Sequence, residues 1–278
     1  MSGRGVQIKT AEQLRLMRAA GLVVAHTLER LVSAVAAGIT TGELDRLAEA
    51  TIRNAGATPS FLGYHGYPGS ICTSVNDEIV HGIPGSRALC DGDVLSIDCG
   101  AIVAGWHGDA AVTVPVGTIA PGHAQLVRDT HDALWAGIAA MRDGGWLRDI
   151  GAAVEALVET RAAAHRAYGM VEEYTGHGIG TEMHQDPDVP NFRTRQKGIR
   201  LRPGVVLAIE PMLTLGDPQT ELLDDGWTVR SADRSVAAHF EHTVALTPEG
   251  PWVLTAVDGG ATRLEALGVP HPGPDGPG

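Results

Sequence analysis

Two stretches near the start of the chain carry hydrophobic residues at helical spacing. Thr10 and Gln13 have the spacing of a capping box at the start of the first stretch. Apolar residues then recur about every three to six positions: Leu14, Met17, Leu22 and Leu28 in the first stretch, and Leu44, Leu47 and Ile52 in the second. We therefore predict one helix that ends near Gly38 and another that Thr41 opens and Gly56 closes.

The remaining pattern alternates between strand-rich and helical segments. Short β-branched runs broken by Gly, Pro and Asn-Asp extend from Phe61 to about Val116 and predict antiparallel strands and hairpins. Helical spacing follows at about 121–142 and 148–167, and a second strand-rich half covers about 170–256. Because no linker separates the halves, we expect a single α+β domain over residues 1–258. The Gly/Pro-rich tail, 259–278, is expected to be disordered.

Composition narrows the class of protein without indicating its chemistry. With 278 residues, 44% hydrophobic and 19% charged, the chain matches a globular protein rather than a disordered or fibrous one. A net charge of −12 argues against broad binding to nucleic acid or membrane, and no apolar run is long enough to span a bilayer. The N-terminus lacks the apolar region of a secretory signal, and the three cysteines contain no C-x-x-C pair. We expect a soluble cytoplasmic protein.

Four acidic residues lie inside apolar runs that are typical of strands. Asp98 and Asp109 stand on either side of a segment short enough for a hairpin turn, so we expect them to face one another on adjacent strands. Glu210 lies near the end of one further strand-like run and Glu241 lies in another. Between these halves comes a Gly-His-Gly phrase centred on His177.

Burial of four carboxylates together is costly unless their charge is compensated. They could be protonated, paired with cationic side chains or neutralised by metal. No Lys or Arg lies within four positions of any of the four, whereas two divalent cations would balance their charge. Oxygen ligands with one imidazole suit Mn, Fe(II), Co or Zn. The charge argument favours a site for two metal ions.

Six phrases in a fixed order resemble those of the pita-bread metallohydrolases, the group that contains methionine aminopeptidases, aminopeptidase P, prolidase and creatinase. The phrases are Tyr64-His65-Gly66-Tyr67-Pro68, Ser74 to Pro84, the Asp98–Asp109 block, Gly176 to Gly180, Ile209 to Met212 and Phe240 to Thr243. Type I methionine aminopeptidases fit best, over about residues 7–257. Type II enzymes carry a helical insertion between His184 and Glu210, and here these residues are only 26 positions apart.

The resemblance implies a fold and a set of metal ligands. The fold would be a curved antiparallel sheet flanked by two pairs of helices. Two divalent ions (Co, Mn, Fe(II) or Zn) would be held by Asp98, Asp109, His177, Glu210 and Glu241. Asp98 would chelate one ion and His177 the other, while Asp109 and Glu241 bridge them. Glu210 would also move a proton between water and the departing amine.

The remaining positions of the resemblance concern the substrate. His184 would contact the scissile carbonyl oxygen, and His81 would hydrogen-bond the amide nitrogen of the cleaved bond. The methionine side chain would occupy a pocket formed at these positions: Phe61, Tyr64, Tyr67, Cys72, Met183 and Trp227. Met183 stands where the family often has Phe. Cys72 is not expected to be a nucleophile, because no motif supplies an activating base.

The implied activity is removal of the initiator methionine from nascent chains whose second residue is small. The implied partners are these nascent chains and, transiently, the ribosome, although no segment of the sequence identifies a docking surface. The family's usual state is a monomer. Two alternatives remain at this point: a peptidase that cuts Xaa-Pro bonds, and a non-catalytic binding protein of the same fold. Relatives of the first kind usually carry a large additional N-terminal domain, and members of the second kind lose metal ligands.

Overall fold

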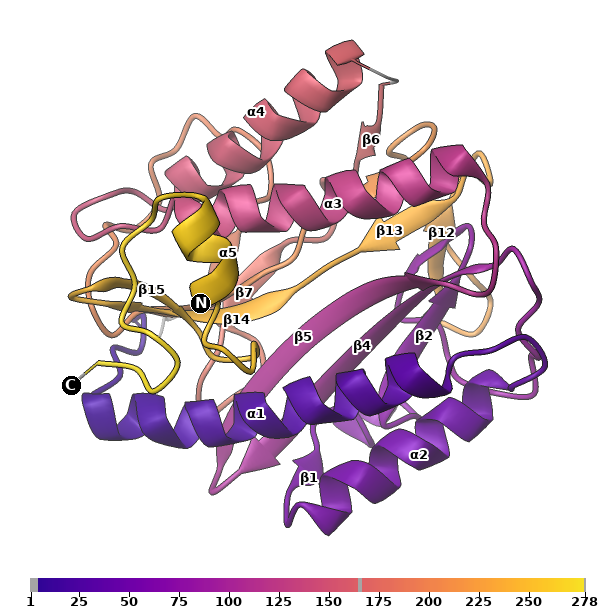
Figure 1. The fold of residues 1–278 in the computed structure, drawn as a ribbon, viewed down its shortest axis with the longest axis horizontal. Coiled ribbons are helices and arrows are strands. Elements are labelled where there is room, and N and C mark those ends of the chain that lie inside the picture. The colour runs from indigo at the N-terminus through magenta and orange to yellow at the C-terminus, as the bar shows by residue number, and fades with distance from the viewer. Residues whose placement is uncertain (1–4, 165–166, 278) are drawn as a thin grey trace.

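The computed structural model describes residues 5–164 and 167–277, which form helices packed on antiparallel strands (Figure 1). The helices are α1 (Ala11–Ala34), α2 (Thr41–Asn54), α3 (Pro121–Ala139), α4 (Arg148–Ala164) and α5 (Ala261–Ala266), with a short 3-10 helix at Tyr64–Gly66. The strands of the first half are β1 (Thr58–Pro59), β2 (Ile71–Val75), β3 (Glu78–Val80), β4 (Val94–Val103) and β5 (Trp106–Pro115). Those that follow are β6 (Gly169–Met170), β7 (Gly176–Gly178), β8 (Gln185–Val189), β9 (Val206–Ile209), β10 (Met212–Thr214), β11 (Thr220–Leu222), β12 (Val229–Ser231), β13 (Ala237–His239), β14 (His242–Thr247) and β15 (Gly250–Val253).

The first half is built on a long hairpin. Strands β4 and β5 pair along their whole length through the two-residue turn Ala104-Gly105, where both residues have positive φ as this tight turn requires. Strand β2 pairs with the other edge of β4. Helices α1 and α2 lie along this sheet (Figure 1) and bury a core that includes Leu31, Leu44 and Ile97.

The second half has its own sheet and its own helix pair. Its strand order is β15-β14-β9-β7-β8, with antiparallel pairing throughout, so β8 forms one edge. Helices α3 and α4 pack against one another and lie on the other side of the strands from α1 and α2 in Figure 1. A core that includes Leu134, Ile150 and Ile209 joins them to the sheet. The two helix pairs therefore enclose a layer of strands, as the sequence predicts.

Hydrogen bonds from threonine hydroxyls join the two halves. Ala111 and Glu241 exchange backbone hydrogen bonds of 3.3 and 2.9 Å. On one side of this pair, Thr243 Oγ1 donates to Asp109 O and accepts from Asp109 N. On the other side, Thr113 Oγ1 does the same for the backbone of His239. We call this contact between β5 and residues 239–243 the seam, since the hydroxyls replace ladder bonds where the strands diverge.

The predicted helix starts are confirmed, and some of the ends differ. The capping box of Thr10 and Gln13 is present, and Thr40 with Glu43 forms a second one directly before Thr41. Helix α1 ends at Ala34, short of Gly38, because Val35 adopts an extended conformation and the chain then turns toward residue 89. The described part of α4 ends at Ala164, and residues 165–166, within its predicted range, lie outside the described residues.

The structure differs from the expected disorder in the tail. Residues 261–266 form α5, and Leu264 is fully buried. The Arg18 guanidinium donates to carbonyl oxygens that include those of Val257 and Pro274. Composition identified the Gly/Pro-rich character of the tail but could not identify this distant hydrogen-bond donor. The domain boundary near residue 258 stays a prediction.

Two expectations about cysteines and membrane spans can be compared with the structure. All three cysteines are free, with Cys72 and Cys99 buried and Cys90 exposed. Among the residues described, no helix combines the length and apolar character needed to cross a bilayer.

Close packing at Gly21 gives a stability prediction. A Cβ at Gly21, inside α1, would lie 2.2 Å from the Leu254 carbonyl oxygen. Gly21→Ala should therefore lower the free energy of unfolding by about 1–3 kcal/mol through overpacking, although alanine is the better helix former. Chemical denaturation would measure this effect. Gly122→Ala in α3 is the control, because a Cβ there meets nothing within 4 Å and stability should not fall. Equal stability of Gly21→Ala and the wild type would contradict the packing argument.

Candidate metal centre

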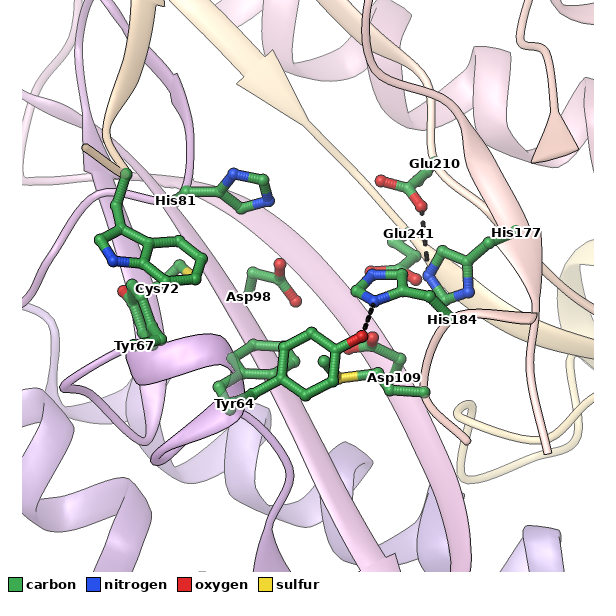
Figure 2. Close-up of a pocket in the computed structure, with 13 residues that line it drawn as sticks. Tyr64, Tyr67, Cys72, His81, Asp98, Asp109, His177, His184, Glu210 and Glu241 are labelled. Carbon is green, nitrogen blue, oxygen red and sulfur yellow. Dashed lines mark hydrogen bonds and ion pairs between the residues drawn. The ribbon is translucent and has the colours of Figure 1, made fainter. Parts of the chain in front are cut away.

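One cavity of about 140 Å³ brings together every site residue that the sequence predicts (Figure 2). Its lining consists of thirteen side chains: Phe61, Tyr64, Tyr67, Cys72, His81, Asp98, Asp109, His177, Met183, His184, Glu210, Trp227 and Glu241. They come from strands of both halves, from the short 3-10 helix and from adjoining loops. The structure thus places all of the predicted site residues in one cavity.

The long hairpin positions the two aspartates. Asp98 on β4 pairs with Ala111 on β5, and Asp109 lies two residues before Ala111. Since alternate residues of a strand share a face, Asp98 and Asp109 are diagonal neighbours on the same face of the sheet. Cys72 on β2 pairs with Asp98 from the other edge and shares that face. The predicted proximity of the two aspartates is therefore confirmed.

Three ligand candidates come from the second half. His177 is the central residue of β7 and pairs with Ala208 on β9. Glu210 directly follows β9, and Glu241 directly precedes β14, where His242 pairs with Ile209. Glu241 is also tied to β5 by the backbone bonds of the seam. The seam therefore brings the carboxylate of Asp109 from the first half close to that of Glu241 from the second.

Burial dominates the electrostatics of this acid cluster. Asp109 and Glu241 are 4% and 2% exposed, and burial raises the pKa of both carboxyls well above the usual range. Burial also raises the pKa of Asp98 to about 7 and that of Glu210 to about 8. Each remaining negative charge raises the pKa of its neighbours further. Without positive charge the cluster favours protonated carboxyls at neutral pH.

The donor atoms fit divalent metal ions. Ligand atoms of Asp109, His177 and Glu241 all lie within 4.8 Å of one another. Asp98 Oδ1, Asp109 Oδ1 and Glu241 Oε1 are buried without a hydrogen-bond partner among the described residues. The cavity lining contains neither Lys nor Arg. Buried carboxylates with free lone pairs and one imidazole are the ligands that hard and borderline divalent ions accept.

The second nitrogen of His177 orients this ligand. His177 Nδ1 lies 3.0 Å from the carbonyl oxygen of Gly178, so Nδ1–H donates there and Nε2 keeps a free lone pair. Nε2 lies 3.6 Å from Glu210 Oε1, and burial lowers the pKa of His177 to about 3. Because neither facing atom carries a proton in the ionised site, a cation can lie between them.

In Figure 2, His81 lies at the end of the cavity opposite His177. It follows β3 and has a left-handed φ of 61°, a conformation that non-glycine residues rarely adopt and that is often found at functional sites. Its ring lies edge-on to Tyr174 and Trp227, with centroid distances of 5.8 and 6.5 Å. Burial lowers the pKa of His81 to about 4, so the imidazole is neutral at pH 7.

His184 is held by Tyr64. The Tyr64 hydroxyl and His184 Nδ1 lie 2.8 Å apart and share a hydrogen bond (Figure 2). The His184 ring also packs against that of His177 at a centroid distance of 4.3 Å. Burial raises the pKa of Tyr64 and lowers that of His184, so both groups are neutral at pH 7. A neutral His184 whose Nδ1 accepts from Tyr64 would carry its proton on Nε2.

The apolar part of the cavity is a small buried cluster. Phe61, Tyr67, Cys72 and Met183 are each less than 10% exposed and pack together, with Trp227 partly covering them. The Tyr67 hydroxyl donates to the carbonyl oxygens of Ile71 and Gly82, which satisfies its polar end. Burial raises the pKa of the Cys72 thiol, in keeping with the expectation that Cys72 is no nucleophile.

Sequence reasoning missed His239. This residue ends β13, is 2% exposed, and has its Nε2 3.6 Å from Glu210 Oε2. It also missed Ile83 and Tyr174, which contact the apolar cluster and His81. A signal for His239 was available, since it precedes Glu241 by two residues and alternate residues of an extended chain share a side.

Comparison with known proteins identifies the family. The model of metallopeptidase family M24 matches residues 15–248. This chain belongs to metallopeptidase family M24. It is 52% identical over 256 residues to methionine aminopeptidase 1 of Mycobacterium tuberculosis, covering 91% of this chain and 96% of that protein. The corresponding protein of Bacillus subtilis is 47% identical over 249 residues, covering 90% and 98%.

Solved structures of the M24 family agree with this placement. The methionine aminopeptidase of Rickettsia prowazekii superposes with a TM-score of 0.87 at 38% identity, covering 90% of this chain and all of that one. Prolidase from Pyrococcus furiosus matches with a TM-score of 0.71 at 19% identity, and this chain covers 65% of its length. The prolidase therefore shares the fold alone. The pita-bread fold and the resemblance to methionine aminopeptidases, both predicted from the sequence, are confirmed.

Burial of the acid cluster predicts how stability depends on pH. Asp98 and Glu210 have pKa values of about 7 and 8 in the folded chain, against about 4 in an unfolded one. The buried histidines, whose pKa is lowered by folding, act in the opposite sense below their ordinary pKa of about 6.5. Between about pH 7 and 8 the carboxyls dominate, so the folded chain binds more protons than the unfolded one and the stability of the metal-free protein falls as pH rises. Thermal unfolding of chelator-treated protein from pH 7 to 8 would measure this decline.

Two controls accompany the pH series. Divalent metal should flatten the decline, because its charge replaces the protons. Asp98→Asn should flatten it in part, because the amide does not titrate. A metal-free protein that becomes more stable from pH 7 to 8 would contradict this account of the cluster.

Proposed function

We propose that this chain removes the N-terminal methionine from nascent polypeptides whose second residue is small. The observation that carries the proposal is an apolar pocket of Phe61, Tyr67, Cys72 and Met183 that shares one cavity with the acid cluster. An unbranched thioether fits such a pocket, and the hydrolytic site then meets the following peptide bond. The methionine aminopeptidases of M. tuberculosis and B. subtilis, which match this chain over nearly their full lengths, support the same reaction.

We assign two divalent ions to the acid cluster. Asp98 would chelate one, His177 and Glu210 the other, and Asp109 and Glu241 would bridge the pair. Co, Mn, Fe(II) and Zn all accept these donors. When bound, the ions supply positive charge that polarises the scissile carbonyl and lowers the pKa of water. Four carboxylates and two divalent ions together are neutral, which relieves the repulsion within the cluster.

The surrounding side chains position the substrate and move its protons. The Tyr64 hydroxyl donates to His184 Nδ1, which leaves Nε2–H of His184 to stabilise negative charge on the carbonyl oxygen. His81, neutral because it is buried, hydrogen-bonds the amide nitrogen of the cleaved bond. Glu210 takes a proton from water and returns it to the departing amine.

The cellular setting follows from the substrate. Nascent chains emerge from ribosomes in the cytoplasm, so we place the reaction there. We expect a monomer, which is the family's usual state.

Peptide hydrolysis after metal reconstitution tests the reaction. The protein would be stripped with a chelator and reloaded separately with Mn, Fe(II), Co or Zn. It would then be given Met-Ala-Ser, Met-Lys-Ser and Ala-Pro-Ser. We expect metal-dependent release of methionine from Met-Ala-Ser, at least about 100-fold faster than from Met-Lys-Ser, because the larger second residue does not fit the closed site.

The other outcomes separate the alternatives. Cleavage chiefly of Ala-Pro-Ser would indicate a peptidase for Xaa-Pro bonds with the same metal centre. A folded protein that binds two ions but cleaves none of the peptides would indicate a non-catalytic binding protein.

We also propose that the ribosome is contacted through a basic segment, residues 193–202. Five cations occur in these ten residues: Arg193, Arg195, Lys197, Arg200 and Arg202. Arg193 pairs with Glu155 and Glu159, whereas the other four are exposed and form no ion pair with the acids among the described residues. Lys197 and Arg200 stack on Trp146.

Two adjoining grooves lead from the basic segment toward the cavity. A groove lined by Arg195 and Asp186 adjoins a second groove, which is lined by Asp186 and His184. A chain with net charge −12 that gathers cations here presents a local surface suited to the phosphates of ribosomal RNA. This position would hold the site next to an emerging substrate.

Charge reversal tests the ribosome contact. Arg195→Glu, Lys197→Glu and Arg200→Glu together should weaken binding to purified ribosomes at least about tenfold. They should also lower the slope of log affinity against log salt by about 2–3, as expected for loss of three phosphate contacts. The matched control reverses the exposed residues Arg15, Arg30 and Arg46 on α1 and α2, and should bind as the wild type does. Equal binding by both triple variants would rule out the basic segment as the docking surface.

A further inference from the structure

The backbone of His239 is hydrogen-bonded at the seam, and its ring faces Glu210 in the acid cluster. Thr113 Oγ1 donates to the His239 carbonyl oxygen at 2.7 Å and accepts the His239 N–H at 2.9 Å. On the other side, His239 pairs with Met212 of β10. The ring is 2% exposed, and Nε2 has no hydrogen-bond partner among the described residues. A buried nitrogen in this position requires a partner.

Glu210 lies between two imidazoles. Glu210 Oε1 is 3.6 Å from His177 Nε2, and Glu210 Oε2 is 3.6 Å from His239 Nε2. The two contacts differ in chemistry. His177 gives its ring proton to Gly178 O and can offer Glu210 only a lone pair. His239 is free to carry its proton on Nε2, because this nitrogen has no hydrogen-bond partner within the described part of the chain.

The neighbours of His239 favour a donor at this atom. Besides Glu210, the charged or titratable groups near it are Asp98, a carboxylate in the metal-loaded site, and His81. A lone pair on Nε2 would face the oxygen of an anionic Glu210, whereas an N–H there meets an acceptor. Shortening 3.6 Å to a hydrogen bond takes a shift of less than 1 Å, within the reach of a glutamate side chain.

We propose that His239 is a positioning residue for Glu210. The Nε2–H of His239 donates to Glu210 Oε2 and thereby turns Glu210 Oε1 toward the ion shared with His177. The inference rests on the metal centre and the function proposed above, and adds a residue to them. Ligating carboxylates are generally held by such hydrogen bonds, and loss of one typically costs 10–100-fold in metal affinity.

The first test measures metal affinity in the absence of turnover. Chelator-stripped protein would be titrated with Co²⁺ in a calorimeter, as wild type, His239→Leu and His239→Gln. We expect His239→Leu to weaken the ion held by His177 and Glu210 by 10–100-fold. His239→Gln keeps an N–H donor and should restore affinity to within about threefold of the wild type. For Met-Ala-Ser, His239→Leu should lower kcat and leave KM nearly unchanged.

A matched control separates positioning from packing. His131→Leu removes another imidazole, one that packs on Phe240 from α3 and contacts Arg263 rather than the acid cluster. It should lower thermal stability and leave Co²⁺ affinity unchanged. Unchanged Co²⁺ affinity in His239→Leu, or equal losses in His239→Leu and His239→Gln, would overturn the proposal. Because affinity is read without substrate, this result stands even if the wild type cleaves no methionine peptide.

A second measurement needs no destabilising variant. In zinc-loaded wild-type protein labelled with ¹⁵N-histidine, long-range proton–nitrogen correlations report which ring nitrogen carries the proton. His239→Gln would assign the signal. We expect a proton on Nε2 of His239. A proton on Nδ1 alone, or direct coordination of zinc by Nε2, would refute the assignment.

Discussion

The concentration of four carboxylates in one enclosed place is the constraint on which the structure depends. Their mutual repulsion and their burial both oppose ionisation, and no basic side chain lines the cavity to offset either effect. The backbone around them is correspondingly rigid: a fully paired hairpin carries Asp98 and Asp109, and Thr113 and Thr243 lock the facing segment on either side of Glu241. The fold holds like charges together so that divalent ions can bind them.

Local pattern predicted much of the secondary structure and the grouping of the acidic residues. The capping box at Thr10, the short turn between Asp98 and Asp109, and the scarcity of nearby bases each led to a correct local expectation. All thirteen predicted site residues line one cavity, but the motif resemblance, rather than periodicity, selected Phe61, Met183 and Trp227. Apolar residues of this kind look the same in a core and in a pocket.

What could not be predicted depended on contacts between distant parts of the chain. His239 has no motif of its own, and its relation to Glu210 exists only because β13 pairs with β10, which begins two residues after Glu210. The order in the tail depends on Arg18, more than 200 positions away. The net charge of −12 gave no indication of the basic segment, because it is a sum over the whole sequence. Function has the same limit. Prolidase shares this fold, so the fold alone does not specify the substrate, which depends on the residues of the pocket.

The seam has a mechanical consequence as well. Strands from the two halves meet there through one reciprocal backbone pair and two threonine hydroxyls, a narrow junction compared with the ten-residue ladder of the hairpin. Asp109 lies on the first-half side of this junction, in β5, and Glu241 lies on the second-half side, directly before β14. An ion bound by both would therefore cross-link the two halves at this junction, and its loss would loosen the contact between β5 and residues 239–243.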